Sequence, residues 1–386
     1  MATDITDIRS PVPLSNAPRL PNIKALTSVR FFAALHVALY HLVRPFTLWG
    51  PLAAFMGSGY VGVSFFFILS GFILTYSHAL EYQREERPPS RFWIARFARI
   101  YPLYLVSLLY GAWFYRSLFH QKVHIVAFVA DLFALQSWSI RAVNFFNVPA
   151  WSISVEAFFY LVFPFLLLRM RPPTRKVAIA TIALFWAVAM ALPVMALIRW
   201  PGASWSEAYD GTYGTNAVFA IRRIPLLMLP EFLAGVTLGW LYLLFPIKEK
   251  AASWIMTLGL CALGITLFFG DRLPFVMLHN GLLLPLFAVI ILGLCGTNWL
   301  SRLMSNTGLV LLGEASFALY LIHFNINDWL KGHYPTQSIG AALIKLAFLI
   351  PVSVLLHLYL ERPGRRIILN WWKSRQTKHE RVTASR

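Results

Sequence analysis

The chain has 386 residues, of which 58% are hydrophobic and only 13% are charged. A soluble domain carries about 25% charged residues, so this composition excludes a soluble protein and predicts one that crosses a membrane many times. The net charge is +18, from 34 Lys and Arg against 16 Asp and Glu. Because the basic residues lie between apolar segments, they indicate cytoplasmic loops and argue against nucleic-acid binding.

The cysteines and the N-terminus set two further limits. Cys261 and Cys295 both lie in apolar runs, which excludes a disulfide framework, and neither has a flanking base that would activate a thiol. The polar segment 1–22 precedes an apolar stretch that Arg30 interrupts. That stretch is too long for the apolar part of a signal peptide, so we expect no cleavable signal and a retained first span.

Ten apolar stretches are long enough to cross a bilayer as helices, which takes about 20 residues each. In chain order they are Ala25–Leu42, Tyr60–His78, Tyr101–Phe119, Trp151–Leu168, Val177–Ile198, Leu226–Phe245, Ala252–Phe269, Leu278–Leu294, Gly308–Phe324 and Ile339–Leu360. A shorter apolar piece, His124–Trp138, contains Asp131. The fold class that we expect is all-α, a polytopic membrane helix bundle of about ten transmembrane helices.

Basic clusters predict which loops face the cytoplasm. Such clusters follow the second, fourth and tenth spans: Arg84, Arg87, Arg91, Arg96 and Arg99; Arg169, Arg171, Arg175 and Lys176; and Arg362, Arg365, Arg366, Lys373 and Arg375. Between the first two clusters the chain crosses an even number of times, so we expect His124–Trp138 to lie at the outer surface or to re-enter. Both termini are then cytoplasmic, with segment 1–22, one membrane domain, 23–366, and a basic tail, 367–386.

Two ionisable residues lie inside the first span, where such groups are costly and usually functional. Arg30 and His41 are eleven residues apart, about three helical turns, so their side chains share nearly one face about 16 Å apart along the axis. A cation near the inner interface and a titratable imidazole farther across predict a site that handles an anionic cofactor and moves a proton. His36 points away from this face, and we interpret it as structural.

The residues that carry chemistry fall into four groups. They are Arg30-x10-His41; the run Phe66–Ile73 followed by Arg96-Phe-Ala-Arg99; Pro149-Ala-Trp151-Ser152-Ile-Ser-Val-Glu156; and Pro230-Glu231-Phe232 with the late run Ser316–His323 and Glu361-Arg362-Pro363. In this order and spacing they resemble the bacterial acyltransferase-3 family, which comprises membrane O-acyltransferases of surface and exported glycans. The resemblance covers roughly residues 23–366 and implies a bundle of about ten helices.

The chain departs from the commonest family pattern at two positions. Leu26–Val29 reads Leu-Thr-Ser-Val where many members have Leu-Asp-Gly-Leu, and Glu156 is followed by Ala157-Phe158 rather than by Glu and Gln. The Thr-Ser form is similar to the branch of exopolysaccharide acetyltransferases. These departures bear on the acceptor and leave Arg30, His41 and Glu156 in place.

The resemblance implies catalytic roles for three residues. His41 is the expected general base for a sugar hydroxyl, since neutral imidazole titrates near physiological pH; the alternative is a structural histidine bonded to a neighbouring helix. Arg30 is expected to hold the donor's phosphates or to orient the site, against the alternative of a snorkelling anchor. Glu156 is expected to orient His41 or to bind the acceptor.

The donor and the acceptor are expected at separate groups of residues. Arg96 and Arg99 are about one turn apart at the expected start of a helix, where two guanidiniums suit a pyrophosphate; the alternative is the positive-inside signal alone. Trp151, Ser152 and His323 are expected to contact the acceptor, with His323 at an outward-facing helix end. For Trp151 the alternative is an aromatic belt residue.

Two other polar residues are interpreted as structural. Ser70 lacks the G-x-S-x-G context of an activated nucleophile, so we interpret it as a helix-packing residue beside a glycine. Glu231 follows Arg222 and Arg223 in the chain, and we expect it to pair with one of them.

The sequence therefore predicts a membrane O-acyltransferase of the bacterial inner membrane. It would move an acyl group, acetyl by default, from acyl-CoA to a sugar hydroxyl of an exported polysaccharide or its lipid-linked precursor. We expect acetyl-CoA as donor, no metal, no nucleic acid, and membrane lipid and other proteins of glycan assembly as partners. The alternatives are a transporter or flippase for a glycan or small anion, which the lack of paired halves disfavours, and an accessory protein without chemistry. The acceptor sugar, the acyl chain, an acyl-enzyme step and the oligomeric state stay open.

Overall fold

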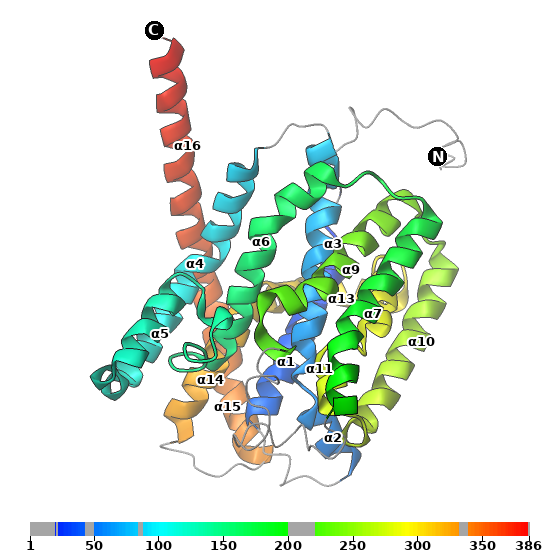
Figure 1. Cartoon of the computed structure of the whole chain (residues 1–386), viewed down its shortest axis with the longest axis horizontal. Helices are drawn as coiled ribbons and strands as arrows, with labels where there is room; N and C mark the ends of the chain where they lie inside the picture. The colour runs from blue at the N-terminus through cyan, green and yellow to red at the C-terminus, as the bar shows by residue number, and fades with distance from the viewer. Residues whose placement is uncertain are drawn as a thin grey trace.

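The computed structural model describes residues 20, 22–42, 50–83, 88–199, 221–331 and 339–384. Within these residues ten helices are long and apolar enough to cross a membrane, and they run side by side as a bundle (Figure 1). Their bounds are α1 (Lys24–Leu42), α3 (Val61–Gln83), α4 (Pro89–Phe114), α6 (Trp151–Arg169), α7 (Arg175–Arg199), α9 (Pro225–Leu244), α10 (Glu249–Phe268), the broken pair α11 (Phe275–His279) and α12 (Leu284–Leu294), α14 (Thr307–Lys331) and α15 (Ile339–Leu356). The chain is therefore an all-helical, multi-pass membrane protein, as its composition predicts.

Short elements connect the long helices. They are α2 (Pro51–Gly57), η3 (Arg116–His120), α5 (Lys122–Leu132), η4 (Gln136–Trp138), η5 (Val148–Ala150), η7 (Gly270–Arg272) and α13 (Trp299–Met304). The apolar piece around Asp131 forms α5, whose 11 residues are too few to cross a bilayer. This agrees with the expectation that His124–Trp138 does not span.

Two helices differ from the spans expected from hydropathy. The third begins at Pro89 rather than Tyr101, because Pro suits the first turn of a helix and the arginines that follow do not break one. The eighth is not one helix: the chain breaks between α11 and α12, where Gly281 has φ 87°. A Cβ on Gly281 would lie 2.8 Å from the Ala189 side chain, so the residue needs both the conformation and the size of glycine.

Glycines bring two pairs of helices into backbone contact. Gly71 of α3 faces the backbone of α9, and Gly235 of α9 faces the Ile68 carbonyl, so that a Cβ at either position would overlap the partner's backbone. Gly313 of α14 lies in the same way against Thr27 of α1. Small residues allow such close crossings, which are typical of helices that associate in a membrane. These two crossings fix α1, α3, α9 and α14 around a common core.

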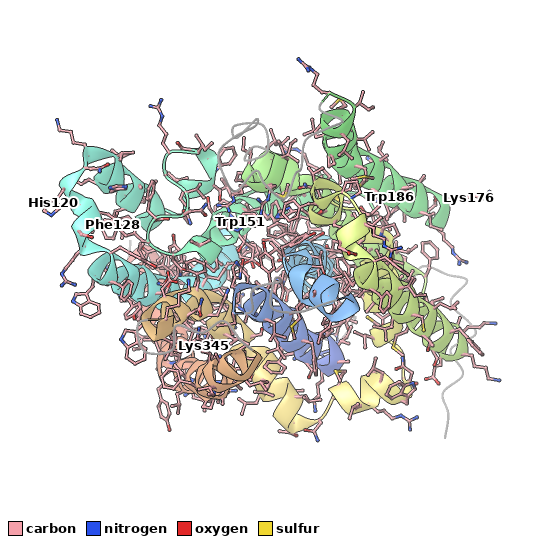
Figure 2. All side chains as sticks on the ribbon, turned by 90° about the horizontal axis from the view of Figure 1, so that it is seen from below. His120, Phe128, Trp151, Lys176, Trp186 and Lys345 are labelled. Carbon is pink, nitrogen blue, oxygen red and sulfur yellow. The ribbon has the colours of Figure 1, made fainter. Side chains whose placement is uncertain are left out.

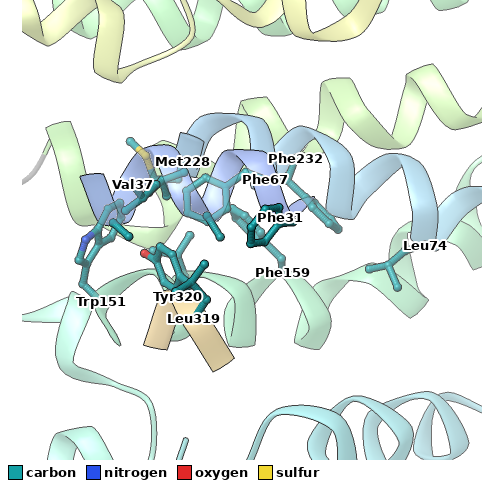
Figure 3. Close-up of a cluster of buried hydrophobic side chains, with 14 of the residues drawn as sticks. Phe31, Val37, Phe67, Leu74, Trp151, Phe159, Met228, Phe232, Leu319 and Tyr320 are labelled. Carbon is teal, nitrogen blue, oxygen red and sulfur yellow. The ribbon is translucent and has the colours of Figure 1, made fainter. Parts of the chain in front are cut away.

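An aromatic core fills the space among these helices (Figure 3). Phe159 stacks on Phe232 at 4.6 Å between ring centroids, and Phe67 meets Phe159 edge-on at 5.2 Å. Trp151 lies at one end of this cluster and Leu74 at the other. Seen from below, Trp151 lies within the bundle, whereas Lys176 and Trp186 lie on the outer helix α7 (Figure 2).

The C-terminal part is a helical column rather than a span followed by an irregular tail. A π-helical turn, η8 (His357–Glu361), joins α15 to α16 (Arg362–Ala384), and α16 packs along α4 (Figure 1). His357 Nδ1 donates to Glu361 at 2.8 Å, and Arg362 Nε donates to His357 Nε2 at 3.0 Å. Arg362 also pairs with Glu314 of α14. Single π turns often mark functional positions, and this one joins the column to α14.

Candidate functional site

A cavity lies among α1, α3, α4, α6 and α14. Its empty volume, open mouth included, is about 790 Å³. Its polar lining residues are Arg30, Ser70, Arg96, Arg99, Ser152, Glu156, Tyr160, Ser316 and Tyr320. The structure therefore brings together five of the residues singled out from the sequence: Arg30, Arg96, Arg99, Ser152 and Glu156.

The charges around this cavity are unequal. Arg30, Arg96 and Arg99 contribute three guanidinium groups, and among the described lining residues Glu156 is the only carboxylate. Tyr160 donates to Glu156 Oε1 at 2.8 Å. Within the described residues no carboxylate forms an ion pair with any of the three arginines. The excess of positive charge suits an anionic ligand.

Arg96 adds a second sign of an anion site. Its Nε is buried without a hydrogen-bond partner in the described part of the chain, and its guanidinium lies 5.7 Å from the Phe92 ring centroid. A buried donor without an acceptor is costly, so such a group usually has a ligand or a water. The residues present therefore fit the phosphates of an acyl-CoA donor.

The origin of this anion site differs from the sequence-based expectation. Arg96 and Arg99 lie two to three turns inside α4, which begins at Pro89. The expectation that they flank a helix N-terminus is therefore wrong, and backbone N–H groups of the first turn do not supply the site. The guanidinium groups themselves carry the positive charge.

Beyond the cavity, two histidines from distant parts of the sequence are in contact. His41 Nδ1 lies 3.1 Å from His323 Nε2 and 3.0 Å from the Val37 carbonyl oxygen. His323 Nδ1 lies 2.6 Å from the Tyr320 carbonyl oxygen. Neither histidine is part of the lining. The base that the family resemblance implies is thus held in a histidine pair next to the cavity rather than in its wall.

Tyr320 lies between the cavity and the histidine pair. Its hydroxyl shares a 2.8 Å hydrogen bond with Ser152 and donates to the Pro149 carbonyl at 3.1 Å. Its backbone carbonyl accepts from His323. Tyr320 therefore contacts both parts of the site, and Ser152 holds its hydroxyl.

His323 and Trp151 are more buried than the sequence suggests. His323 was expected at an outward-facing helix end, but α14 continues to Lys331 and the side chain is 0% exposed. Trp151 is 7% exposed, and the Arg223 guanidinium lies 5.5 Å from its ring centroid. Within the described residues, both are covered by protein, so contact with an acceptor would require them to become accessible.

Sequence reasoning missed several residues of the site. Tyr160, Tyr320 and Ser316 line the cavity, as does Ser70, which the sequence analysis interprets as a packing residue. The only sequence signal was that Ser70 lies in the run Phe66–Ile73 and that Ser316 and Tyr320 lie in the run Ser316–His323. Glu231 does not pair with an arginine as expected: it is 2% exposed, and neither carboxylate oxygen has a hydrogen-bond partner in the described part of the chain.

Comparison with known proteins gives the family of this chain. The model of the family described as "Acyltransferase domain" matches residues 23–358. The chain is 29% identical over 380 residues to Acyltransferase MdmB of Streptomyces mycarofaciens, covering 91% of this chain and 94% of that protein. It is 25% identical over 375 residues to O-acetyltransferase OatA of Staphylococcus aureus, covering 89% of this chain but only 57% of OatA. No solved structure matches it.

The family match decides between the enzyme and the transporter suggested by the sequence. It covers nearly the whole helix bundle, including the cavity and the histidine pair. The fold, the match and the two relatives agree that this chain belongs to the acyltransferase-3 family of membrane O-acyltransferases.

Proposed function

We propose that this protein transfers an acyl group, acetyl by default, from acyl-CoA to a sugar hydroxyl of an exported polysaccharide or its lipid-linked precursor. The supporting observation is the cavity whose described lining contains Arg30, Arg96 and Arg99 and a single carboxylate, Glu156. Acyl-CoA carries phosphates, and guanidinium groups bind phosphates through paired, charge-assisted hydrogen bonds. We place the enzyme in the inner membrane of a bacterium, with membrane lipid and other glycan-assembly proteins as its neighbours.

The reaction needs a base at the acceptor hydroxyl. In this proposal His41 takes the hydroxyl proton while the oxygen attacks the thioester carbonyl; the C–S bond then breaks and the leaving thiolate receives a proton. Glu156, which accepts a hydrogen bond from Tyr160, reduces the net positive charge of the arginine cluster.

The donor and the base come from opposite ends of the site. The basic clusters at the helix ends support a donor side in the cytoplasm, and Arg30 and His41 lie about 16 Å apart along α1. The acyl arm therefore reaches from the arginines past Tyr320 toward His41. In this proposal the acceptor approaches His41 from the other side.

The first test is base-labile acetate on the exported glycan of cells that carry the wild type, His41→Ala, His36→Ala or an empty vector. His36 is a matched control on the same helix, because its ring contacts the Phe55 carbonyl outside the site. The proposal expects acetate with the wild type and His36→Ala only, at equal membrane expression. Full acetylation by His41→Ala would exclude His41 as the base. If no strain shows acetate, a glycan acceptor is wrong.

A further inference from the structure

We propose that His323 is a positioning residue that fixes the tautomer and orientation of His41. The inference rests on the proposed function, which makes His41 the base. It rests on a series of three connected hydrogen bonds: His323 to the Tyr320 carbonyl, His41 to His323, and His41 to the Val37 carbonyl. No sequence motif links the two histidines, which are 282 residues apart.

The proton positions in this hydrogen-bond series follow from the carbonyl oxygens at its two ends. A carbonyl oxygen only accepts hydrogen bonds, so His323 Nδ1, at 2.6 Å from the Tyr320 oxygen, carries a proton. In a neutral imidazole the other nitrogen then has the lone pair, so His323 Nε2 is an acceptor. It faces His41 Nδ1 at 3.1 Å. His41 Nδ1 must therefore be the donor.

The same assignment satisfies the third contact. His41 Nδ1–H is shared between His323 Nε2 and the Val37 carbonyl, which lies 3.0 Å away and also accepts. The lone pair of His41 is left on Nε2, the nitrogen that a base needs for proton abstraction. With Val37 alone the ring would have a single acceptor on its own helix; His323 adds a second one from α14.

This arrangement also helps the step that follows. When His41 Nε2 takes a proton the ring becomes a cation, and hydrogen bonds from a charged donor are stronger than those from a neutral one. In hydrolase triads a carboxylate orients the histidine in this way. Here the partner is a neutral histidine, which orients the ring without adding a buried negative charge. The charged groups that face His41 from other elements and along α14 are Arg223, Asp328 and Lys331.

The burial of His323 favours this role over direct contact with an acceptor. Its side chain is 0% exposed, and both ring nitrogens are engaged, one by Tyr320 and one by His41. A residue that binds substrate needs a polar atom available to it. His323 therefore acts on the reaction through His41.

Two amide substitutions test the roles of the two ring nitrogens of His323 one at a time. His323→Gln places an amide near the position of Nε2, where its oxygen accepts from His41. His323→Asn reaches only the position of Nδ1, so it retains the bond to Tyr320 and leaves His41 without its second acceptor. We expect kcat to fall by less than about 10-fold in Gln and by about 100-fold or more in Asn, with the KM for acyl-CoA unchanged in both, because removing an orienting group acts on the chemical step.

Several outcomes would overturn the inference. Equal activity of the folded Gln and Asn variants would show that His41 does not need the acceptor. A raised KM for the acceptor with unchanged kcat would make His323 a substrate contact. If His41→Ala is inactive while both His323 variants retain full activity, the proposed function stands and this inference fails; if His41→Ala is active, the proposed function itself fails.

A spectroscopic measurement covers the case in which a variant does not fold. In wild-type protein with 15N-labelled histidine, the signal that disappears in His41→Ala identifies the ring. A proton on Nδ1 and a lone pair on Nε2 are expected at neutral pH. A proton on Nε2 instead would refute the assignment.

Discussion

Single residues set the charge of this site. Arg30, Arg96 and Arg99 share one cavity with one carboxylate, Glu156, and the described residues leave all three without an ion pair. Cations gathered in this way repel one another and lose solvation, which costs stability unless a ligand compensates. An anionic ligand is thus expected to stabilise the fold as well as to react, because a ligand that binds only the folded state shifts unfolding.

Arg96→Gln should weaken acyl-CoA binding. A hydrogen bond to a charged group contributes about 1.5–3 kcal/mol, so the Kd should rise about 10- to 100-fold. Arg91→Gln, on the exposed part of the same helix, is the matched control and should leave the Kd near the wild-type value. Titration of the purified protein with acyl-CoA measures both. Equal effects on the Kd at the two positions would show that Arg96 does not bind the donor and serves only to orient the protein in the membrane.

Asp131 predicts a pH dependence of stability outside the spans. It is 4% exposed, and burial raises the pKa of its carboxyl from 3.8 to about 8. Between these values the folded state holds the proton that the unfolded state releases, so the free energy of unfolding falls as the pH rises from about 4 to about 8, by at most about 1.4 kcal/mol per pH unit. Asp131→Asn should therefore gain Tm relative to wild type at pH 8 and little at pH 5. A Tm difference that does not change with pH would contradict this.

At the scale of elements, the helices owe their arrangement to a few close crossings. Gly71 and Gly235 place α3 and α9 in backbone contact, and Gly313 does the same for α14 against α1. Dispersion between tightly packed backbones is a main source of helix association in lipid, where the hydrophobic effect contributes little. Because the cavity lining comes from α1, α3 and α14 as well as α4 and α6, these crossings also fix the site.

Gly235→Ala should destabilise the bundle. The added Cβ would overlap the backbone of Ile68, and overpacking of this kind costs about 1–3 kcal/mol or more. Gly264→Ala is the control, since a Cβ there meets nothing within 4 Å and alanine favours a helix. Thermal unfolding in detergent should show a lower Tm for Gly235→Ala and an unchanged or higher Tm for Gly264→Ala. The same Tm for both variants would show that α3 and α9 can move apart at Gly235 without loss of stability.

At the scale of the whole molecule, the ten candidate spans of the described residues predict that both ends of the chain lie on one side of the membrane. The basic clusters predict that this side is the cytoplasm, which is also where acyl-CoA is available to the arginines. A reporter that fluoresces only in the cytoplasm should be active at the C-terminus and inactive when inserted at the connection between α14 and α15. The reverse pattern would invert the topology and place the donor cavity on the wrong side.

The sequence was sufficient for the architecture and for part of the site. Spans follow from hydropathy, and the motif runs indicated Arg30, Arg96, Arg99 and Glu156, which the structure brings to one cavity. Mean hydropathy does not detect a break such as the one at Gly281, which depends on a backbone angle. Nor does local sequence contain the contact between His41 and His323, because it depends on how α1 packs against α14.

The position of Tyr320 has a consequence for the route of the acyl group. Tyr320 lines the cavity, its hydroxyl is hydrogen-bonded to Ser152 and Pro149, and its backbone carbonyl accepts from His323. On the proposed function, the acyl arm passes this side chain to reach His41, so the hydrogen bonds that hold the Tyr320 hydroxyl restrict the path of the acyl group.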